Sequence, residues 1–288
     1  MRVAFSDSSS GEMSLSTLVQ IRPRTDLAVP VSWLLLPLAS YLLWAVFVVS
    51  WWAAGAGLGT GDLALAVGVL GIVGLAASAA ASYLVYALLN RASLHFGRTR
   101  ALLRNAISGL ESRIGTAGQE ALLPLTSAEE GLYKLSRGEH ERSAVLWALL
   151  ASVPIVGWIF LVAALWFLSR DFAKHCRLEE LVLDDVDRTM RGAGLQGVSV
   201  RNVPVGSRDV LGAAVVIASL IELLSVFLLG PAGGLVLIYL TVGAFSLIWL
   251  DLSIRDPNSH FSFHSQLEPD ILRSLPDSVS GAGTEGVA

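Results

Sequence analysis

A long uncharged stretch decides the fold of this chain: residues 63–89 read LALAVGVLGIVGLAASAAASYLVYALL. As a helix this stretch would extend about 40 Å, against about 30 Å for the hydrocarbon core of a bilayer. Further apolar runs occur at residues 31–54, 144–168, 210–229 and 234–250. We therefore expect an all-α fold, that of a polytopic α-helical membrane protein.

The composition agrees with this class. The 288 residues are 53% hydrophobic and 15% charged, with a mean hydropathy of +0.63, whereas soluble domains carry about 25% charged residues. A single cysteine excludes an internal disulfide framework and a multi-cysteine zinc site. The net charge is −4 and no separate basic domain exists, so we expect no nucleic-acid partner. The first 30 residues lack the apolar core of a cleaved secretory signal.

Two of the segments that connect the apolar runs contain no lysine or arginine. The short Gly- and Pro-rich segments 55–62 and 230–233 carry none, whereas 90–143 carries 8 and 169–209 carries 7. Each short segment is therefore expected to join two antiparallel spans. Because cytoplasmic loops normally hold the excess of basic residues, the long polar stretches are expected on the cytoplasmic side.

The path of residues 144–168 decides whether all basic residues lie on one side of the membrane. A single crossing would leave 11 basic residues on one side and 9 on the other, whereas a hairpin that enters and leaves on one side leaves 20 and 0. We favour the hairpin, because Pro154 and Gly157 lie near the middle, where the helix must break. A kinked single span is the alternative.

Four full spans plus this re-entrant or kinked fifth segment divide the chain into parts, with both termini in the cytoplasm of a cell-membrane protein. We expect a cytoplasmic N-terminal tail (1–30), a membrane hairpin plus interfacial helix (31–114), a cytoplasmic connector (115–143), the re-entrant or single-span segment plus amphipathic helix (144–209), a membrane hairpin plus interfacial helix (210–275) and a disordered tail (276–288).

Two apolar stripes at helical spacing predict the cytoplasmic amphipathic helices. We expect these helices to lie along the membrane or to pack on each other. Ser127 and Glu130 form a capping box, which predicts that a further short helix begins there. The stripes are Leu103, Ile107, Leu110 and Ile114, and Leu178, Val182, Val186 and Met190.

Similar polar sequences follow three of the apolar blocks and indicate an internal repeat. Equivalent ends of repeated units should lie on the same side of the membrane, which favours the hairpin topology. A second alignment of the last two copies, shifted by one helical turn, matches His175 with His264. The motif residues are Arg91 and His95, then Arg170, Asp171 and His175, and finally Arg255, Asp256, His260 and His264.

The third copy also resembles a known family. Thr241-Val242-Gly243, Trp249 and Asp256-Pro257-Asn258-x-His260-Phe261 are similar to the pattern of domain-of-unknown-function family 4234, a group of small prokaryotic membrane proteins. The resemblance is clearest over residues 235–273 and fainter over 150–180. It implies a multi-pass membrane fold and supplies no catalytic residue.

Glu222 is the one ionisable residue well inside an expected span. Because a charged side chain there costs about 3 kcal/mol, it should face the bundle interior, be protonated or have a partner. Reflection through the turn at 230–233 places Tyr239 and Thr241 at the same depth. The functional interpretation is a proton or cation relay, and the structural one is a protonated carboxyl group that holds helices together.

The five histidines, at positions 95, 140, 175, 260 and 264, all lie within a few turns of an expected membrane boundary. His260 and His264 share one helical face, so a metal site completed by Asp171, Glu179, Asp256 or Glu268 is one interpretation. We favour the other, in which histidine and arginine bind carboxylates at the lipid headgroups, and we predict no metal and no cofactor.

Three further patterns are interpreted as structural. The Gly74, Ser78 and Ser82 ladder lets another helix approach closely. The acidic residues between 179 and 191 lack the spacing of a magnesium-diphosphate motif and indicate a solvated helix face. Cys176 is expected as a small apolar residue.

Three classes of function remain. The favoured class is a non-catalytic scaffold, sensor or membrane-shaping protein, because no catalytic constellation is present. The alternatives are a transporter or channel component that uses Glu222, and a metal-dependent or lipid-modifying enzyme at the cytoplasmic face, which requires at least three histidines to converge. The expected partners are the lipid bilayer and a homo-oligomer or another membrane protein.

Overall fold

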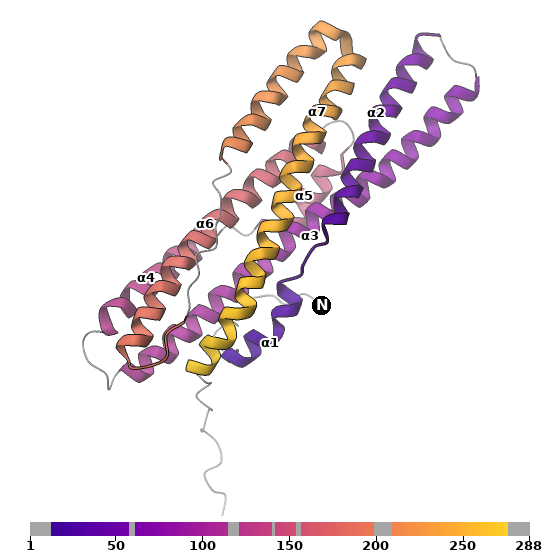
Figure 1. The fold of residues 1–288 in the computed structure, drawn as a ribbon. Coiled ribbons are helices and arrows are strands. Elements are labelled where there is room, and N and C mark those ends of the chain that lie inside the picture. Colours follow the sequence, from indigo (N-terminus) through magenta and orange to yellow (C-terminus); the bar gives the residue numbers. More distant parts are fainter. Residues whose placement is uncertain are drawn as a thin grey trace, which may run out of the picture.

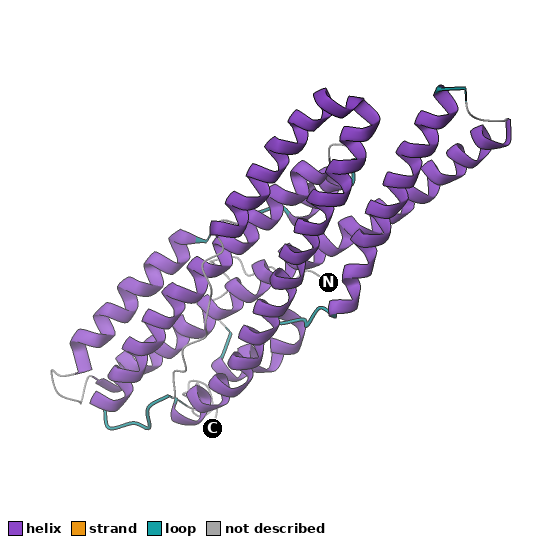
Figure 2. Ribbon diagram, turned by 45° about the horizontal axis from the view of Figure 1, so that its top comes forward, coloured by secondary structure: helices purple, strands orange, loops and turns teal. Residues whose placement is uncertain are grey.

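The computed structural model describes residues 13–57, 61–114, 121–139, 142–153, 157–198 and 209–275. Within these ranges the chain is helical and contains no strand, which confirms the all-α prediction (Figure 2). The elements are α1 (Leu15–Thr25), the 3₁₀ turn η1 (Val31–Leu34), α2 (Leu35–Gly55), α3 (Gly61–Ile114), α4 (Leu122–Gly138), α5 (Ala144–Ala151), α6 (Gly157–Gly192) and α7 (Asp209–Ser274).

The molecule has an apolar end and a charged end. Figure 1 shows the tips of the α2–α3 hairpin and of α7 at one end, with α1 and α4 toward the other. The segments that build the apolar end, 25–90, 143–169 and 209–254, contain no lysine or arginine. Val31–Gly55 and Ala64–Ile114 are each long and apolar enough to cross a membrane. Their outer faces are unsuited to water, since Leu65 is 72% and Ile72 is 71% exposed.

The long helices run through both ends without interruption. α3 has 54 residues and is about 80 Å long, because no proline removes a backbone hydrogen bond between Gly61 and Ile114. The expectation of a separate interfacial helix after residue 90 is therefore wrong. The stripe from Leu103 to Ile114 continues the apolar half of α3 as a single helix.

The segment 144–168 forms a helical hairpin. The Trp147 and Phe167 rings lie 5.3 Å apart, and Arg142 Nε lies 2.9 Å from Asp171 Oδ2, so α5 and the start of α6 run side by side in opposite directions. Gly157 permits the turn, because a Cβ there would lie 2.4 Å from the carbonyl oxygen of Ala151. Pro154 lies outside the described residues.

A glycine also turns the chain within α7. Gly230 has φ 76° and ψ 167°, a non-helical conformation that favours glycine. The two limbs that meet there run antiparallel (Figure 1). The turn therefore lies at the start of the expected connection 230–233.

The charged end has its own core, to which five helices contribute. The sequence's second stripe is buried here, with Val182, Val186 and Met190 completely inaccessible. The N-terminal segment 1–30 is more than a tail, because α1 begins at the Ser14 cap and buries Leu18 in this core. The predicted capping box is wrong: α4 begins at Leu122, and Ser127 lies inside it. The tail 276–288 lies outside the described residues.

Candidate metal centre

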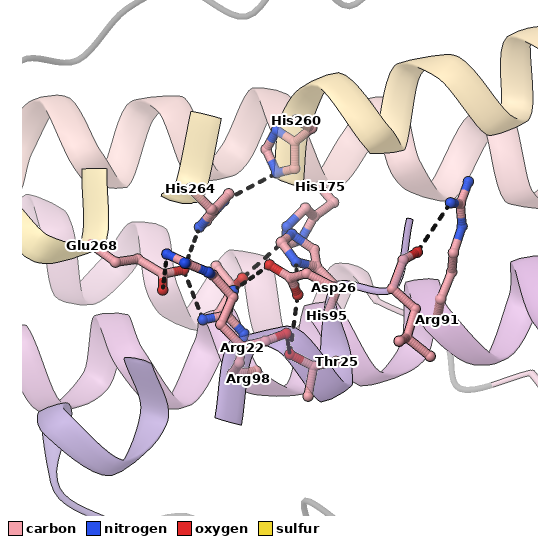
Figure 3. Close-up of polar contacts among 12 residues, drawn as sticks. Arg22, Thr25, Asp26, Arg91, His95, Arg98, His175, His260, His264 and Glu268 are labelled. Carbon is pink, nitrogen blue, oxygen red and sulfur yellow. Dashed lines mark hydrogen bonds and ion pairs between the residues drawn. The ribbon is translucent and has the colours of Figure 1, made fainter. Parts of the chain in front are cut away.

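Four of the five histidines meet where the apolar end joins the charged end (Figure 3). α3 supplies His95, α6 supplies His175, and one face of α7 supplies His260 and His264. All four are buried within the protein, so they do not face lipid headgroups, whereas the expected pairing with carboxylates is confirmed for His95, His175 and His264. His140 lies outside the described residues.

Glu179 lies at the centre of this cluster. It follows His175 by one turn of α6 and is 1% exposed. Its Oε1 lies 2.8 Å from His264 Nε2, and its Oε2 lies 3.0 Å from His260 Nε2 and 3.4 Å from His175 Nε2. Neither oxygen, nor His175 Nε2, has a hydrogen-bond partner of good geometry in the described structure. Buried polar atoms are rarely left in this state unless a further group binds them.

Each of the four imidazoles contacts a partner on the outside of the cluster through its Nδ1 atom. Three of these outer contacts are carboxylates, and the Cys176 thiol takes the fourth. Metal-ligating histidines characteristically have such an outer acceptor, which fixes the ring orientation and its tautomer. The pairs are His95 Nδ1 with Asp26 at 2.9 Å, His175 Nδ1 with Glu139 at 2.5 Å, His264 Nδ1 with Glu268 at 3.0 Å, and His260 Nδ1 with Cys176 at 3.7 Å.

The inner spacings suit a metal ion. Ligand atoms at about 2.0–2.1 Å from one ion are about 3.0–3.4 Å apart in tetrahedral or octahedral geometry. The Nε2 atoms of His260 and His264 are 3.2 Å apart, within this range. The donor atoms of His95, His175, Glu179 and His260 all lie within 4.8 Å of one another.

The protonation of the cluster reflects this crowding. Burial lowers the pKa of His175, but the hydrogen bond to Glu139 and contact with Glu179 raise it to about 9. The pKa of His264 is likewise raised to about 10, against the effect of burial, by Glu179 and Glu268. Burial lowers the pKa of His260. The neighbouring imidazoles outweigh burial at Glu179 and hold its pKa well below the usual range.

Arginines balance the outer carboxylates. Arg98 is fully buried and contacts Asp26 Oδ2 and Glu268 Oε1, each at 2.7 Å. Arg100 Nε lies 3.0 Å from Glu139 Oε2. The three carboxylates behind the histidines are therefore neutralised from outside, which leaves Glu179 as the charge that faces the interior of the cluster.

Arg91 explains the Asp256-Pro257-Asn258 motif. Pro257 has no N–H, so the carbonyl of Ser253, four residues earlier, loses its helical donor. Arg91 Nη2 donates to that carbonyl at 2.8 Å, and Nη1 donates to Asn258 Oδ1 at 2.7 Å. Asn258 in turn donates to the Val29 carbonyl at 3.0 Å. This contact fixes α3 against α7 one turn from His95.

The other motif residues lie outside the cluster. Asp171 is bound by Arg142, and Arg255 donates to Asp251 at 2.8 Å on the surface. Arg170 is exposed and Asp256 is half-buried. Of the four carboxylates proposed to complete a site, Glu179 and Glu268 take part, whereas Asp171 binds Arg142 outside the cluster.

The remaining sequence candidates have other surroundings. The side chains of Glu222, Tyr239 and Thr241 lie outside what the structure describes. Ser78 accepts from Trp44 Nε1 at 2.7 Å and lies 3.0 Å from Ser40, and a Cβ at Gly74 would lie 3.3 Å from Trp44, so α2 packs on this face of α3. Ser82 bonds to the Ser78 carbonyl at 2.8 Å.

Three acidic residues after Glu179 have partners outside the histidine cluster, and Arg188 contacts two of them, Asp184 and Asp185. Asp184 binds Arg188, Asp187 accepts from the Val198 backbone at 2.7 Å, and Asp185 accepts from Ser127 at 2.6 Å. Their carboxylates therefore form no shared site of the magnesium-diphosphate type.

Sequence reasoning missed Asp26, Arg98 and Glu139. Asp26 ends α1 and Glu139 directly follows α4, so neither belongs to a periodic pattern. A weak signal existed for Arg98, which lies three residues after His95 and thus on the same helical face.

Comparison with known proteins finds no matching family, no similar curated protein and no similar solved structure. Membership of family 4234 therefore stays a prediction.

Proposed function

We propose that this chain is a multi-pass membrane metalloprotein that holds one divalent transition-metal ion between four histidines and Glu179. The observation that carries the proposal is the common orientation of the ligands. His175, His260 and His264 direct Nε2 at one buried carboxylate, while their Nδ1 atoms contact outer partners. Both Glu179 oxygens face imidazole nitrogens at ion-pair distances, and neither has a hydrogen bond of good geometry, so both are placed to bind an ion that replaces the imidazole protons.

The donor set favours a late first-row metal. Imidazole nitrogen suits zinc, iron, copper and nickel, whereas magnesium and calcium require oxygen ligands. Four imidazoles and one carboxylate therefore support zinc or iron.

The same donor set supports a metal-dependent enzyme, which we place ahead of a scaffold. Five protein ligands leave one position of a six-coordinate ion for water or a small reactant. The scaffold proposal needs apolar stripes that meet a bilayer, yet Leu103 and Val182 are buried in the protein core. Transport through Glu222 draws no support from the described residues.

The membrane placement follows from charge and hydropathy. We place the four long apolar runs across the bilayer, the α5–α6 hairpin part-way into it, and the charged end in the cytoplasm with both termini. A cavity is lined jointly by Ser78, Ala151 and Gly157, so the hairpin tip is level with the middle of the apolar half of α3. In this arrangement the metal centre lies on the cytoplasmic side of the membrane, next to the ends of the spans.

Metal analysis of the purified protein tests the proposal. We expect about one zinc or iron ion per chain after purification or after equilibration with either ion. Glu179→Gln should lose the ion, whereas Glu130→Gln, at an exposed position on α4, should keep it. Absence of stoichiometric metal under both loading conditions, or equal metal in the two variants, would overturn the proposal.

A further inference from the structure

A pocket opens beside the metal centre at the membrane boundary. One wall is apolar and contains Leu89, Ala92 and Leu168, and the other wall is charged. Leu89 and Leu168 are the last apolar residues of their runs. In the proposed orientation, the apolar wall therefore lies at the depth of the acyl chains and the charged wall lies at the depth of the headgroups.

Two arginines of the charged wall contact carboxylates of the described residues through Nε. Arg142 donates to Asp171 through Nε, and its Nη groups donate no hydrogen bond within the described residues. Arg100 approaches Glu139 through Nε as well. Both remain accessible, at 27% and 15%. Terminal guanidinium nitrogens have the spacing that binds phosphate oxygens in pairs.

The pocket is rigid at this wall and continuous with the centre. The Arg142 guanidinium carbon lies over the Phe167 ring, 3.8 Å from its centroid. Glu139 lines the pocket and contacts His175 through its other oxygen. Phe96, also in the lining, stacks on His175 with centroids 4.2 Å apart.

We propose that this pocket binds the phosphate headgroup of an anionic membrane lipid, with Arg142 and Arg100 on the phosphate and the acyl chains extending from the pocket into the bilayer. The carboxylates of Asp171 and Glu139 keep their Nε contacts, and the lipid phosphate binds the terminal guanidinium nitrogens, for which the described residues provide no acceptor. An anionic lipid then becomes the substrate class of the metal centre, a step that rests on the proposed function. Basic pockets between membrane helices bind lipid headgroups by the same chemistry.

Native mass spectrometry of the full-length protein tests the pocket. Wild type should retain phosphatidylglycerol about tenfold more tightly than phosphatidylcholine with the same chains, because the choline cation of phosphatidylcholine offsets the phosphate charge and is repelled by the two arginines. Arg142→Gln should lose this preference, whereas Arg188→Gln, exposed on α6, should keep it. Ser93→Glu places a negative charge at an exposed lining position and should also abolish it.

Three results would overturn the proposal. Wild type could lack the preference for phosphatidylglycerol, or Arg188→Gln could reduce that preference as much as Arg142→Gln does. Excess inorganic phosphate could also displace the lipid completely, which would assign the site to a soluble anion. Metal content is measured on the same samples. Lipid preference without metal refutes the proposed function alone, whereas metal without lipid preference refutes the pocket alone.

Discussion

Metal binding should release protons from two histidines. The pKa values of His175 and His264 in the metal-free protein are about 9 and about 10, so both rings are cationic at pH 7. A metal ligand must be neutral, so each ring loses its proton when the ion binds. At pH 7 this competition lowers the apparent affinity about 10⁵-fold relative to pH values above 10, and the affinity should rise about 100-fold per pH unit between pH 7 and 9.

Calorimetry in two buffers with different ionisation enthalpies counts these protons directly. Zinc binding at pH 7 should release about two protons per ion from wild type and about one from His264→Gln. Chelator competition at pH 7, 8 and 9 gives the slope of affinity against pH. Release of no protons, or an affinity that is constant over this range, would refute the assignment of these two rings as cationic ligands.

Four further outcomes are expected. In the metal-free protein, the raised pKa values of His175 and His264 stabilise the fold fully below the ordinary value of 6.5, and this contribution should disappear as the pH rises through about 9 and about 10, which thermal unfolding with a chelator measures. Glu139→Gln should lower the pKa of His175 in an NMR titration, because the carboxylate that favours the imidazolium is lost, whereas Glu130→Gln should leave it unchanged. Arg91→Met should destabilise the protein by about 3 kcal/mol, since two buried acceptors lose their donor, whereas removal of the exposed Arg255 should have an effect below about 0.5 kcal/mol in denaturant titration. Gly157→Ala should destabilise by about 1–3 kcal/mol through overlap with the Ala151 carbonyl, whereas Gly68→Ala, with no atom within 4 Å, should be neutral or stabilising in thermal unfolding.

Several features of the fold are properties of short stretches and were predicted on that basis. The apolar run at 63–89 specifies a long helix through its length alone, and Gly230 marks a turn because its backbone adopts a positive φ. The break near Gly157 follows from the same local logic. The structure of the polar stretches does not depend on local sequence alone. Residues 91–114 continue the helix of the span because nothing interrupts it and because their apolar stripe packs against α4 and α6.

Only some residues of the candidate centre could be predicted from the sequence. The spacing of His260 and His264 indicated a shared face, and Glu179 and Glu268 were among the proposed carboxylates. The expectation that the histidines face lipid headgroups failed for the four described ones, which are buried. Distance from a hydrophobic run indicates how deep a residue lies along a helix axis and not which neighbour it faces. Asp26 is 69 residues from His95, and no periodicity connects them.

The sequence by itself determined the helical class, the apolar end and the turns, because hydrophobic length, charge and backbone freedom act over a few residues. Only the tertiary structure decided that histidines from α3, α6 and α7 surround one carboxylate. That convergence depends on how long helices pack side by side, with the Arg91 contact to α7 setting their relative position, and packing of this kind is a property of the assembled chain.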